Sequence, residues 1–579
     1  MTQQQCDILI VGASLGGVAA ALWAADAGAS VVLLEESTWL GGQLAAQGVC
    51  TPDENAWVEE GGCSRSWQQL RGDIRAHYRE RHTLSELGAS QPRLNPGSCW
   101  VSRISVEPRV AHALLQRMVS RRSGVHLHFR TRVTGVDVRN GQVRAVFARR
   151  AGRPPAAWMP GMVLDATDLG DLLPLAGVDH VVGAESREET GEPDAPDSAR
   201  PEWIQPITVP FALELRPPGE NHAIPPPPGY AQLKALQQYH VLDGAMRGMW
   251  GELSWWEYRR VIAAENFRDP AFPCDVAMIN TGSNDFKGGV MPTGDAARDA
   301  QTVAHARLAS RGYIHWLQTE CPRADDPGRR GYPELCLRGD WFGTPDGLAP
   351  APYIRESRRI LALRTIREQD VVAADSSGRP WQEGPRASHQ PDSVGIGHYW
   401  LDIHAGASGE PGLFLETRPF QIPLGALVPL RARNLLPACK NIGATHLASG
   451  AYRLHPIEWS IGEAAAALAV HCLAWRRDPQ DVARDTDAVR QIQEDLIAAG
   501  VPVYWWGDLP PGHALFARAQ RLAMDGFWPG GDSVLFRPNE LLTQAEAAEI
   551  DQRLGARPEW PGARLSRGEA LEWLASRIA

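Results

Sequence analysis

The chain has 579 residues, 44% hydrophobic and 22% charged, which is ordinary for a globular protein of about three or four domains. Its net charge is −10, and no run of lysine and arginine offsets it, which argues against a nucleic-acid-binding surface. No apolar run approaches the roughly 18 residues of a membrane span, and the polar N-terminus enters a strand at once, so we expect neither a membrane span nor a signal peptide. Nine widely spread cysteines indicate reduced, mostly buried thiols in a cytoplasmic protein.

A strand, a glycine turn, a helix and a second strand follow one another near the N-terminus. Residues 7–11 (DILIV) suit a buried parallel strand, and an Ala-rich segment with helical spacing comes after the turn. Residues 30–34 form the second strand. In such a βαβ unit the helix N-terminus receives a pyrophosphate, and an acid about 20 residues on takes a ribose hydroxyl. The GxGxxG fingerprint has glycine where this chain has Ser14. The predicted dinucleotide contacts are Gly12, Ser14, Gly16, Gly17, Glu35 and Glu36.

The following residues, Trp39 to Leu44 (WLGGQL), resemble the second glycine-rich loop of FAD enzymes with the glutathione-reductase-like fold. Rossmann domains specific for NAD usually lack this loop. The resemblance implies that FAD is the cofactor, with Glu35 on the adenosine ribose. It also implies that the stretch containing Gly42, Gln43 and Gln47 lies near the ribityl chain and the flavin.

The segment after this loop, residues 48–71, is polar and Gly-rich, and we expect it to be irregular, with a helix beginning at residue 72. Cys50 and Cys63 are 13 residues apart. That spacing allows a redox pair, but without a CxxC motif two unpaired thiols are the favoured interpretation.

Residues 129–148 predict a β-hairpin that turns at Asn140-Gly141. The resemblance implies that the strand containing Val133 passes the adenine. Residues 163–170 (VLDATDLG) predict a strand that returns to the nucleotide domain, and its carboxylates, Asp165 and Asp168, are interpreted as turn and helix-cap residues.

A departure from the nucleotide-binding core begins near residue 185, where Pro, Glu and Asp become frequent. We expect the chain to re-enter a sheet at residues 207–215 and to form an amphipathic helix at residues 299–320. This region, up to residue 420, is interpreted as an inserted α+β substrate domain.

An arginine-rich cluster, residues 352–359 (PYIRESRR), lies in this domain. Arg355 and Arg359 are at positions i and i+4, so a helix would present them together, with Arg358 beside them. Guanidinium groups in that arrangement suit an anionic substrate or the charge of reduced flavin. The alternative is a solvated, salt-bridged face.

A second polar cluster, residues 392–404, contains His398 and His404. Each is either a buried structural histidine or an active-site acid or base, because imidazole titrates near neutral pH. The sequence leaves both interpretations open.

A strand, a glycine-bearing loop and a small-residue helix recur at residues 434–470, after predicted β structure at residues 420–425 and 427–430. In flavoproteins of the resembled fold this segment closes the sheet and its helix N-terminus faces the flavin, which places Asn441 and Ile461 in the cofactor site. Within it, GAYRL resembles the GANRL of the fumarate reductase and aspartate oxidase group. There the arginine binds a substrate carboxylate, which implies that role for Arg453; Tyr452 replaces the asparagine. His446 and His455 flank the motif.

The character of the chain changes after residue 478. Residues 487–500 predict an amphipathic helix, and residues 515–549 resemble one S-layer-homology repeat, with Thr543 and Glu546 at capping-box spacing. The match is carried by Phe536, Pro538, Thr543 and Glu546. Because there is a single copy, we interpret this region as a helical appendage that packs on the body or makes an oligomer contact.

Taken together, motifs through most of residues 5–475 resemble the bacterial FAD-dependent oxidoreductase family. The predicted α/β fold has a Rossmann-like FAD-binding core at residues 1–184 and 421–478, an inserted substrate domain at 185–420 and a helical appendage at 479–579. The predicted reaction is hydride transfer between a small polar or anionic substrate and flavin N5. Its predicted acid–base residues are His404 and His446, and its predicted substrate-binding residues are Arg355 and Arg453. We predict no metal site.

The electron acceptor is left open as oxygen, a quinone or a protein. Two alternatives compete with this prediction: an FAD enzyme that modifies a macromolecule such as tRNA, and a non-catalytic binding or surface protein with a vestigial Rossmann core. The acidic net charge opposes the first, and retention of the flavin motifs opposes the second. A homo-oligomer is compatible with the sequence.

Overall fold

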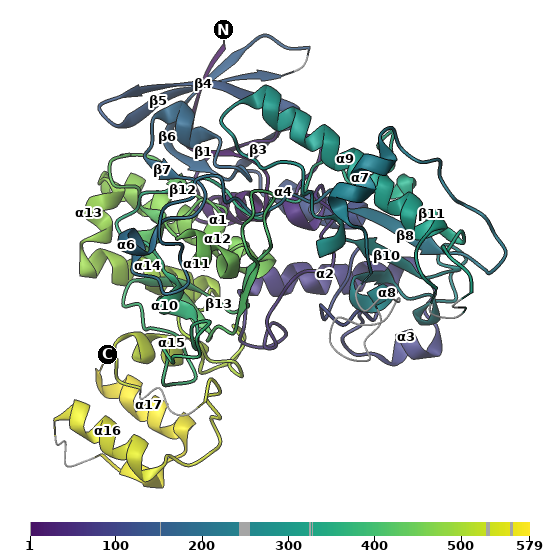
Figure 1. The fold of residues 1–579 in the computed structure, drawn as a ribbon. Helices are drawn as coiled ribbons and strands as arrows, with labels where there is room; N and C mark the ends of the chain where they lie inside the picture. The colour runs from purple at the N-terminus through teal and green to yellow at the C-terminus, as the bar shows by residue number, and fades with distance from the viewer. Residues whose placement is uncertain are drawn as a thin grey trace.

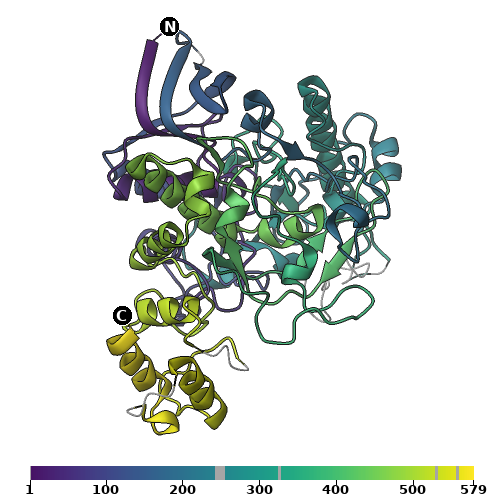
Figure 2. The same ribbon diagram turned by 90° about the vertical axis from the view of Figure 1, so that its left-hand side faces the viewer.

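The structure is a computed structural model that describes residues 2–150, 152–241, 255–323, 326, 328–528, 533–555 and 560–578. Figure 1 shows the N-terminal strands at one end of the molecule and the C-terminal helices at the other. A sheet close to the N-terminus, a second sheet beside helix α9 and the terminal group of helices are its main parts, and Figure 2 shows the C-terminal helices standing away from the sheets.

The larger sheet is built from parallel strands in the order β3-β2-β1-β6, with β17 pairing the carboxyl end of β6. Its strands are β1 (Thr2–Val11), β2 (Val31–Leu34), β3 (Val125–His128), β6 (Ala156–Asp165) and β17 (Leu435–Pro437). All of them except the edge strand β3 are buried near their carboxyl ends, as parallel strands covered by helices are. Strand β17 returns to the sheet some 270 residues after β6. This confirms the prediction that the segment at residues 434–470 closes the sheet that begins with β1.

The predicted hairpin extends this sheet as β4 (Thr131–Arg139) and β5 (Gln142–Arg150), with β5 antiparallel to β6. Asn140 and Gly141 both have positive φ, 53° and 73°, which is the backbone that a two-residue type I′ turn requires. The hairpin prediction is therefore confirmed.

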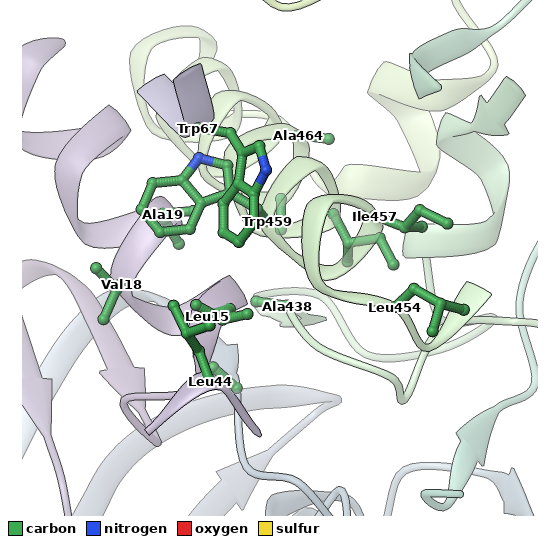
Figure 3. Packing of buried hydrophobic residues seen from close by; sticks show 14 of the residues in the cluster. Leu15, Val18, Ala19, Leu44, Trp67, Ala438, Leu454, Ile457, Trp459 and Ala464 are labelled. Carbon is green, nitrogen blue, oxygen red and sulfur yellow. The ribbon is translucent and has the colours of Figure 1, made fainter. Parts of the chain in front are cut away.

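Two helices cross beneath the nucleotide end of the sheet: α1 (Leu15–Asp26) and α12 (His455–Trp475). Figure 3 shows Leu15, Val18 and Ala19 of α1 close to Trp459 and Ala464 of α12, with Trp67 beside them. The Trp67 and Trp459 rings lie 5.4 Å apart. Among the described helices α12 is long and apolar enough to cross a membrane, but 83% of its most apolar window is buried, as in a core helix.

The second sheet is antiparallel in the order β11-β8-β10-β9. It contains β8 (Phe211–Leu215), β9 (Arg260–Ile262), β10 (Val276–Ile279) and β11 (Leu335–Leu337). Helix α9 (Ala296–Thr319) packs against it in a separate apolar cluster, and Asp295 caps the helix by accepting from the Ala297 backbone N–H at 2.9 Å. The predicted sheet re-entry and the predicted long helix are both confirmed.

The remaining described helices and short strands connect these layers. The helices are α2 (Arg65–Arg81), α3 (Glu86–Ser90), α4 (Pro108–Ser120), α5 (Leu172–Ala176), α6 (Arg187–Thr190), α7 (Tyr230–Gln237), α8 (Trp255–Tyr258), α10 (Glu368–Val371), α11 (His446–Tyr452) and α13 (Pro479–Ala483). The strand pairs are β7 (His180–Val181) with β12 (Arg359–Ile360), β13 (Ser393–Gly397) with β16 (Phe420–Pro423), and β14 (Leu401–Ile403) with β15 (Leu413–Leu415).

Two sequence-based element predictions are wrong. Helix α2 begins at Arg65 rather than at residue 72, because Ser64 caps it by accepting from the Trp67 N–H. Residues 427–430 do not form a strand: Leu427 ends a 3-10 helix, Leu424–Leu427, and Pro429 makes an isolated β-bridge to Ala362.

The C-terminal region has two parts. Helix α14 (Thr486–Ala499), which confirms the predicted amphipathic helix, packs into the same apolar core as α12. Helices α15 (Phe516–Met524), α16 (Gln544–Leu554) and α17 (Arg567–Ile578) share an apolar cluster of their own, centred on residues such as Phe536 and Leu571. Thr543 and Glu546 form the predicted capping box. The resemblance to an S-layer repeat stays a prediction.

Candidate active site and cofactor cradle

The glycine turn after β1 is shaped by backbone contacts. Gly12 has φ +95°, and a Cβ on it would lie 2.4 Å from the Ala166 carbonyl oxygen. A Cβ on Gly16 would lie 1.9 Å from the Ala438 carbonyl oxygen, and one on Gly17 would lie 2.1 Å from that of Gly12. These glycines are therefore required by the close approach of α1 to β6 and to the chain that follows β17.

Ser14 caps helix α1 at the position where the fingerprint has glycine. Its φ is −60°, which any residue adopts, so no glycine is needed there. Its hydroxyl oxygen accepts from the Gly17 N–H at 3.2 Å and caps α1. The departure from GxGxxG thus strengthens the helix N-terminus that the predicted pyrophosphate would face.

Glu35 ends β2 at the same edge of the sheet and is half-buried. Its carboxylate accepts from the Ala13 N–H at 2.8 Å and the Ser37 N–H at 2.7 Å. Burial raises the pKa of this carboxyl, although these hydrogen bonds oppose the rise. The position beside the Gly12 turn is the one that a ribose-binding acid takes in a βαβ unit. Glu36, by contrast, is exposed and lies 3.6 Å from Arg132. Val133 is on β4, paired with Ala148.

The second glycine loop lies against the start of α1. Gly41 and Gly42 have φ of +98° and +43°, and a Cβ on Gly42 would lie 3.0 Å from the Ser14 Cα. The Gln43 side chain is fully buried and donates to the Glu458 carboxylate at 2.6 Å. Its Oε1 has no hydrogen-bond partner among the described residues. A buried orphan acceptor in a cradle of small residues fits a cofactor that brings a donor.

Three other predicted cofactor residues are held by the protein itself. The Gln47 Oε1 accepts from the Ile354 N–H at 3.2 Å, and the Asn441 Nδ2 donates to the Asp165 carbonyl at 3.0 Å. Ile461 is fully buried in α12. These contacts fix the three residues within the protein. That they also contact the cofactor remains a prediction.

A buried cation that the sequence analysis did not single out lies at the same place. Lys440 is 5% exposed, and its Nζ contacts Asp168 at 2.5 Å and Glu458 at 3.4 Å. Glu458 also accepts from the Gly16 N–H at 3.2 Å. An ammonium group beside a capped helix N-terminus suits a phosphate. Asp165 accepts from the N–H groups of Thr167 and Leu172, both at 3.1 Å, so it is a turn and cap residue as predicted.

The predicted arginine helix does not exist. Residues 352–358 are extended and lead into β12, so Arg355, Arg358 and Arg359 do not share a face. Each has its own carboxylate partner: Asp285 at 2.9 Å, Asp171 at 3.1 Å and Glu185 at 3.0 Å, respectively. The i, i+4 argument was wrong because long-range ion pairs, not helix propensity, determine this segment.

Arg355 nevertheless joins two other predicted residues through shared carboxylates. Asp285 contacts both Arg355, at 2.9 Å, and the His404 Nδ1, at 2.5 Å. The Asp402 Oδ2 contacts both the His404 Nε2, at 3.2 Å, and the Arg453 Nη2, at 3.0 Å. We call the row Arg355–Asp285–His404–Asp402–Arg453 the charged chain. The His404 and Asp402 side chains are 24% and 22% exposed, whereas the other three are almost fully buried, so the middle of the chain faces solvent.

The residues of the charged chain shift the pKa values of His404 and Asp285. Burial and Arg355 disfavour the charged form of His404, but Asp402 and Asp285 outweigh them and raise its pKa. Burial raises the pKa of Asp285, but Arg355 and His404 outweigh it and leave that pKa lowered to about 2. His404 thus lies between two carboxylates that favour its protonated form.

His446 occupies a separate, buried cluster at the start of α11. Its Nδ1 lies 3.0 Å from the Glu356 carboxylate and its Nε2 contacts Glu410, with only 2% of its side chain exposed. Burial opposes the charge, but Glu356 and Glu410 raise its pKa to about 10. This environment favours a fixed imidazolium rather than a proton carrier. The acid–base role of His446 remains an untested prediction.

Arg453 ends α11 and is fixed from two sides. Its Nη1 donates to the Tyr353 hydroxyl at 2.7 Å, while its Nε is buried without a partner among the described residues. Tyr452, which replaces the asparagine of the resembled motif, stacks on Phe420 at 4.4 Å and donates to the Gln421 carbonyl at 2.8 Å. Tyr452 is thus a packing residue, and it makes none of the hydrogen bonds that fix the Arg453 side chain.

Burial favours the neutral form of the other two predicted histidines, His398 and His455. Burial lowers the pKa of His398 and of His455 to about 4. His455 accepts from the Asp53 N–H at 3.2 Å and its Nε2 lies 2.9 Å from the Val49 carbonyl. Both fit the structural interpretation. Cys50 and Cys63 are free, and burial raises the pKa of each thiol well above its ordinary range, as expected for unpaired thiols.

Several charged or phenolic residues near Arg453 were missed. Arg259 pairs with Asp53 at 2.9 Å, and the Tyr353 hydroxyl and the Asp402 carboxylate both accept from Arg453. Asp402 could have been selected from the sequence, because it stands two residues before His404 in the polar cluster. Asp285 and Asp53 gave no such signal, because they contact His404 and Arg259 from 119 and 206 residues away along the sequence.

A parallel sheet with a glycine turn and an acid after its second strand are the features of an α/β dinucleotide-binding domain. Residues 7–496 match the family described as FAD dependent oxidoreductase, and the chain belongs to this family, with FAD as its cofactor. No curated protein is similar enough to be matched.

The solved structures that match this chain are distant. They include p-nitrophenol 4-monooxygenase from Pseudomonas putida DLL-E4, with 13% identity over 63% of this chain and 70% of that chain and a TM-score of 0.29. A myxobacterial chondrochloren halogenase has 16% identity over 38% and 45%, with a TM-score of 0.23. L-proline dehydrogenase from P. horikoshii has 14% identity over 32% and 25%, with a TM-score of 0.17. These scores carry no argument about substrate.

Proposed function

We propose that this FAD-dependent oxidoreductase transfers a hydride between FAD and a small polar or anionic substrate that binds at the solvent-facing middle of the charged chain. The observation that carries the proposal is that Arg453 and His404, which supply an anion-binding group and a proton-holding group, contact the same oxygen of Asp402. The reaction needs both groups: one to orient a carboxylate and one to manage the proton that accompanies the hydride.

The role of Arg453 follows from its fixed position. Tyr353 and Asp402 hold two of its nitrogens, so the planar group is oriented before substrate arrives. An oriented guanidinium binds a carboxylate more tightly than a mobile one, because little conformational freedom is lost on binding. The Arg453 Nε is a buried donor for which the described residues offer no acceptor.

The role of His404 follows from its flanking carboxylates. Asp285 and Asp402 hold the imidazole ring in one orientation and stabilise its proton. His404 is partly exposed and can contact a substrate, whereas His446 is buried and cannot. In the direction of substrate oxidation, neutral His404 accepts the substrate proton; in the reverse direction the imidazolium returns it. FAD, when bound, supplies the two-electron chemistry, and Ser14, Glu35, Gln43 and Lys440 are the residues that would hold it.

Anaerobic bleaching of the flavin absorbance tests the proposal, using a panel of small hydroxy and amino carboxylates and their amides. We expect bleaching by a carboxylate and not by its amide. Arg453→Gln should raise the KM for that carboxylate at least 10-fold with a smaller change in kcat, while Arg298→Gln, on the exposed surface of α9, should change neither. Equal bleaching by acid and amide, or an unchanged KM in Arg453→Gln, would remove Arg453 from the substrate site. We further propose a cytoplasmic enzyme that returns its electrons to oxygen, a quinone or a protein.

A further inference from the structure

A cavity of about 230 Å³ lies beside the C-terminal half of α1, away from the charged chain. Its walls come from α1, α2, α12 and the end of α14. Asp26 and Arg122 stand at its mouth, where Arg122 makes two hydrogen bonds to the Asp26 carboxylate, at 2.9 and 2.8 Å. Because each neutralises the other, the mouth carries no uncompensated charge.

A buried carboxyl group, that of Glu463, also lines this cavity. Glu463 of α12 is 3% exposed, and one of its oxygens accepts from the Ser66 hydroxyl. Its other oxygen, Oε2, is buried with no hydrogen-bond partner among the described residues. Burial without a partner is costly for a carboxyl oxygen and raises the pKa of Glu463 to about 7. A cation placed beside Oε2 would offset that cost and favour the carboxylate.

Apart from Ser66, the rest of the lining is apolar. Ala19 and Leu22 are buried, and Trp23 contributes its ring. The lining thus offers an apolar wall and one carboxyl group whose Oε2 has no hydrogen-bond partner among the described residues. This combination suits a molecule with a charged donor at one end and a short hydrocarbon at the other.

We propose that this cavity is a second ligand site, which binds a small aliphatic ammonium compound with its nitrogen on Glu463 and its alkyl chain on Ala19 and Leu22. The site is independent of FAD and of the charged chain. A carboxylate ligand would meet the charge of Glu463, and a neutral alcohol would supply a donor without the ion pair. We therefore expect the ammonium compound to bind more tightly than the alcohol or the carboxylate.

Isothermal titration calorimetry of the FAD-loaded protein tests the order with n-butylammonium, n-butanol and n-butyrate. We expect one n-butylammonium site per chain, with at least 10-fold weaker binding of the other two. Glu463→Gln keeps the shape and an acceptor for Ser66 but removes the charge, and it should weaken n-butylammonium at least 10-fold. Asp73→Asn, on α2 outside the cavity, is the matched control and should bind like the unmodified protein.

A second variant separates loss of the site from loss of the fold. Ala499→Leu adds bulk at the cavity wall from an exposed position on α14 and leaves Glu463 intact. It should also abolish n-butylammonium binding while the protein retains FAD. Unchanged n-butylammonium binding in either variant, no binding to the unmodified protein, or n-butyrate or n-butanol binding as tight as n-butylammonium, would overturn the proposal.

Discussion

Replacing Gly462 with alanine tests the helix crossing on which the FAD cradle depends. A Cβ at this position of α12 would lie 2.0 Å from the Gly16 carbonyl oxygen and 2.7 Å from the Gly16 Cα. An ordinary contact needs about 3.5 Å, so α1 and α12 would have to separate by about 1.5 Å. The atoms that meet the new methyl group are backbone atoms, which cannot rotate away. Overpacking of this kind costs about 1–3 kcal/mol or more.

The assay for this variant is urea denaturation of the FAD-loaded protein, together with titration of FAD into the apoprotein. We expect Gly462→Ala to unfold at lower urea and to bind FAD more weakly, because the same separation moves Gly16 and the start of α1. Gly72→Ala is the matched control: Gly72 lies within α2, nothing lies within 4 Å of the added Cβ, and stability should rise by up to about 1 kcal/mol. If Gly462→Ala is as stable as the unmodified protein and binds FAD equally well, the close crossing is not what holds the cradle together.

Three further predictions follow from individual contacts. Glu35→Gln should weaken FAD binding about 10-fold or more, the effect of about 1.5 kcal/mol expected for a hydrogen bond to a charged group, and an absorbance titration with an unchanged dissociation constant would exclude the ribose role. His446→Gln should be less stable than the unmodified protein below pH 6.5, and the difference should shrink as pH rises toward 10, because the folded pKa of about 10 exceeds the ordinary 6.5; a difference independent of pH in urea unfolding would refute a charged His446. Thr543→Ala should cost α16 about 1 kcal/mol through loss of its capping box, seen as faster hydrogen exchange there, and unchanged exchange would contradict the capping role.

Several elements of the fold could be predicted because their sequence signals are local. The β1–α1–β2 unit, the hairpin at Asn140-Gly141 and the capping box at Thr543 each depend on residues within a short stretch. Spacing along the chain and backbone preference decide such elements without help from distant segments.

The candidate active site could be predicted only in part, since its contacts join distant segments. His404 and Arg453 were selected from motifs, but the carboxylates that hold them in one charged chain come from elsewhere: Asp285 lies 119 residues from His404. The arginines at 355–359 show the same limit. Their spacing suggested one helix face, whereas three separate ion pairs direct them to three places.

The pH dependence of anaerobic flavin bleaching by the best carboxylate found in the screen tests the central claim most directly. With His404 as the base, the bleaching rate of the unmodified protein should rise with pH through a pKa above the ordinary 6.5, because Asp402 and Asp285 raise that pKa. His404→Asn should lose this rise and react slowly at every pH, whereas His305→Asn, on the exposed surface of α9, should keep the full profile. A His404→Asn profile that coincides with that of the unmodified protein would contradict the account and require another proton carrier.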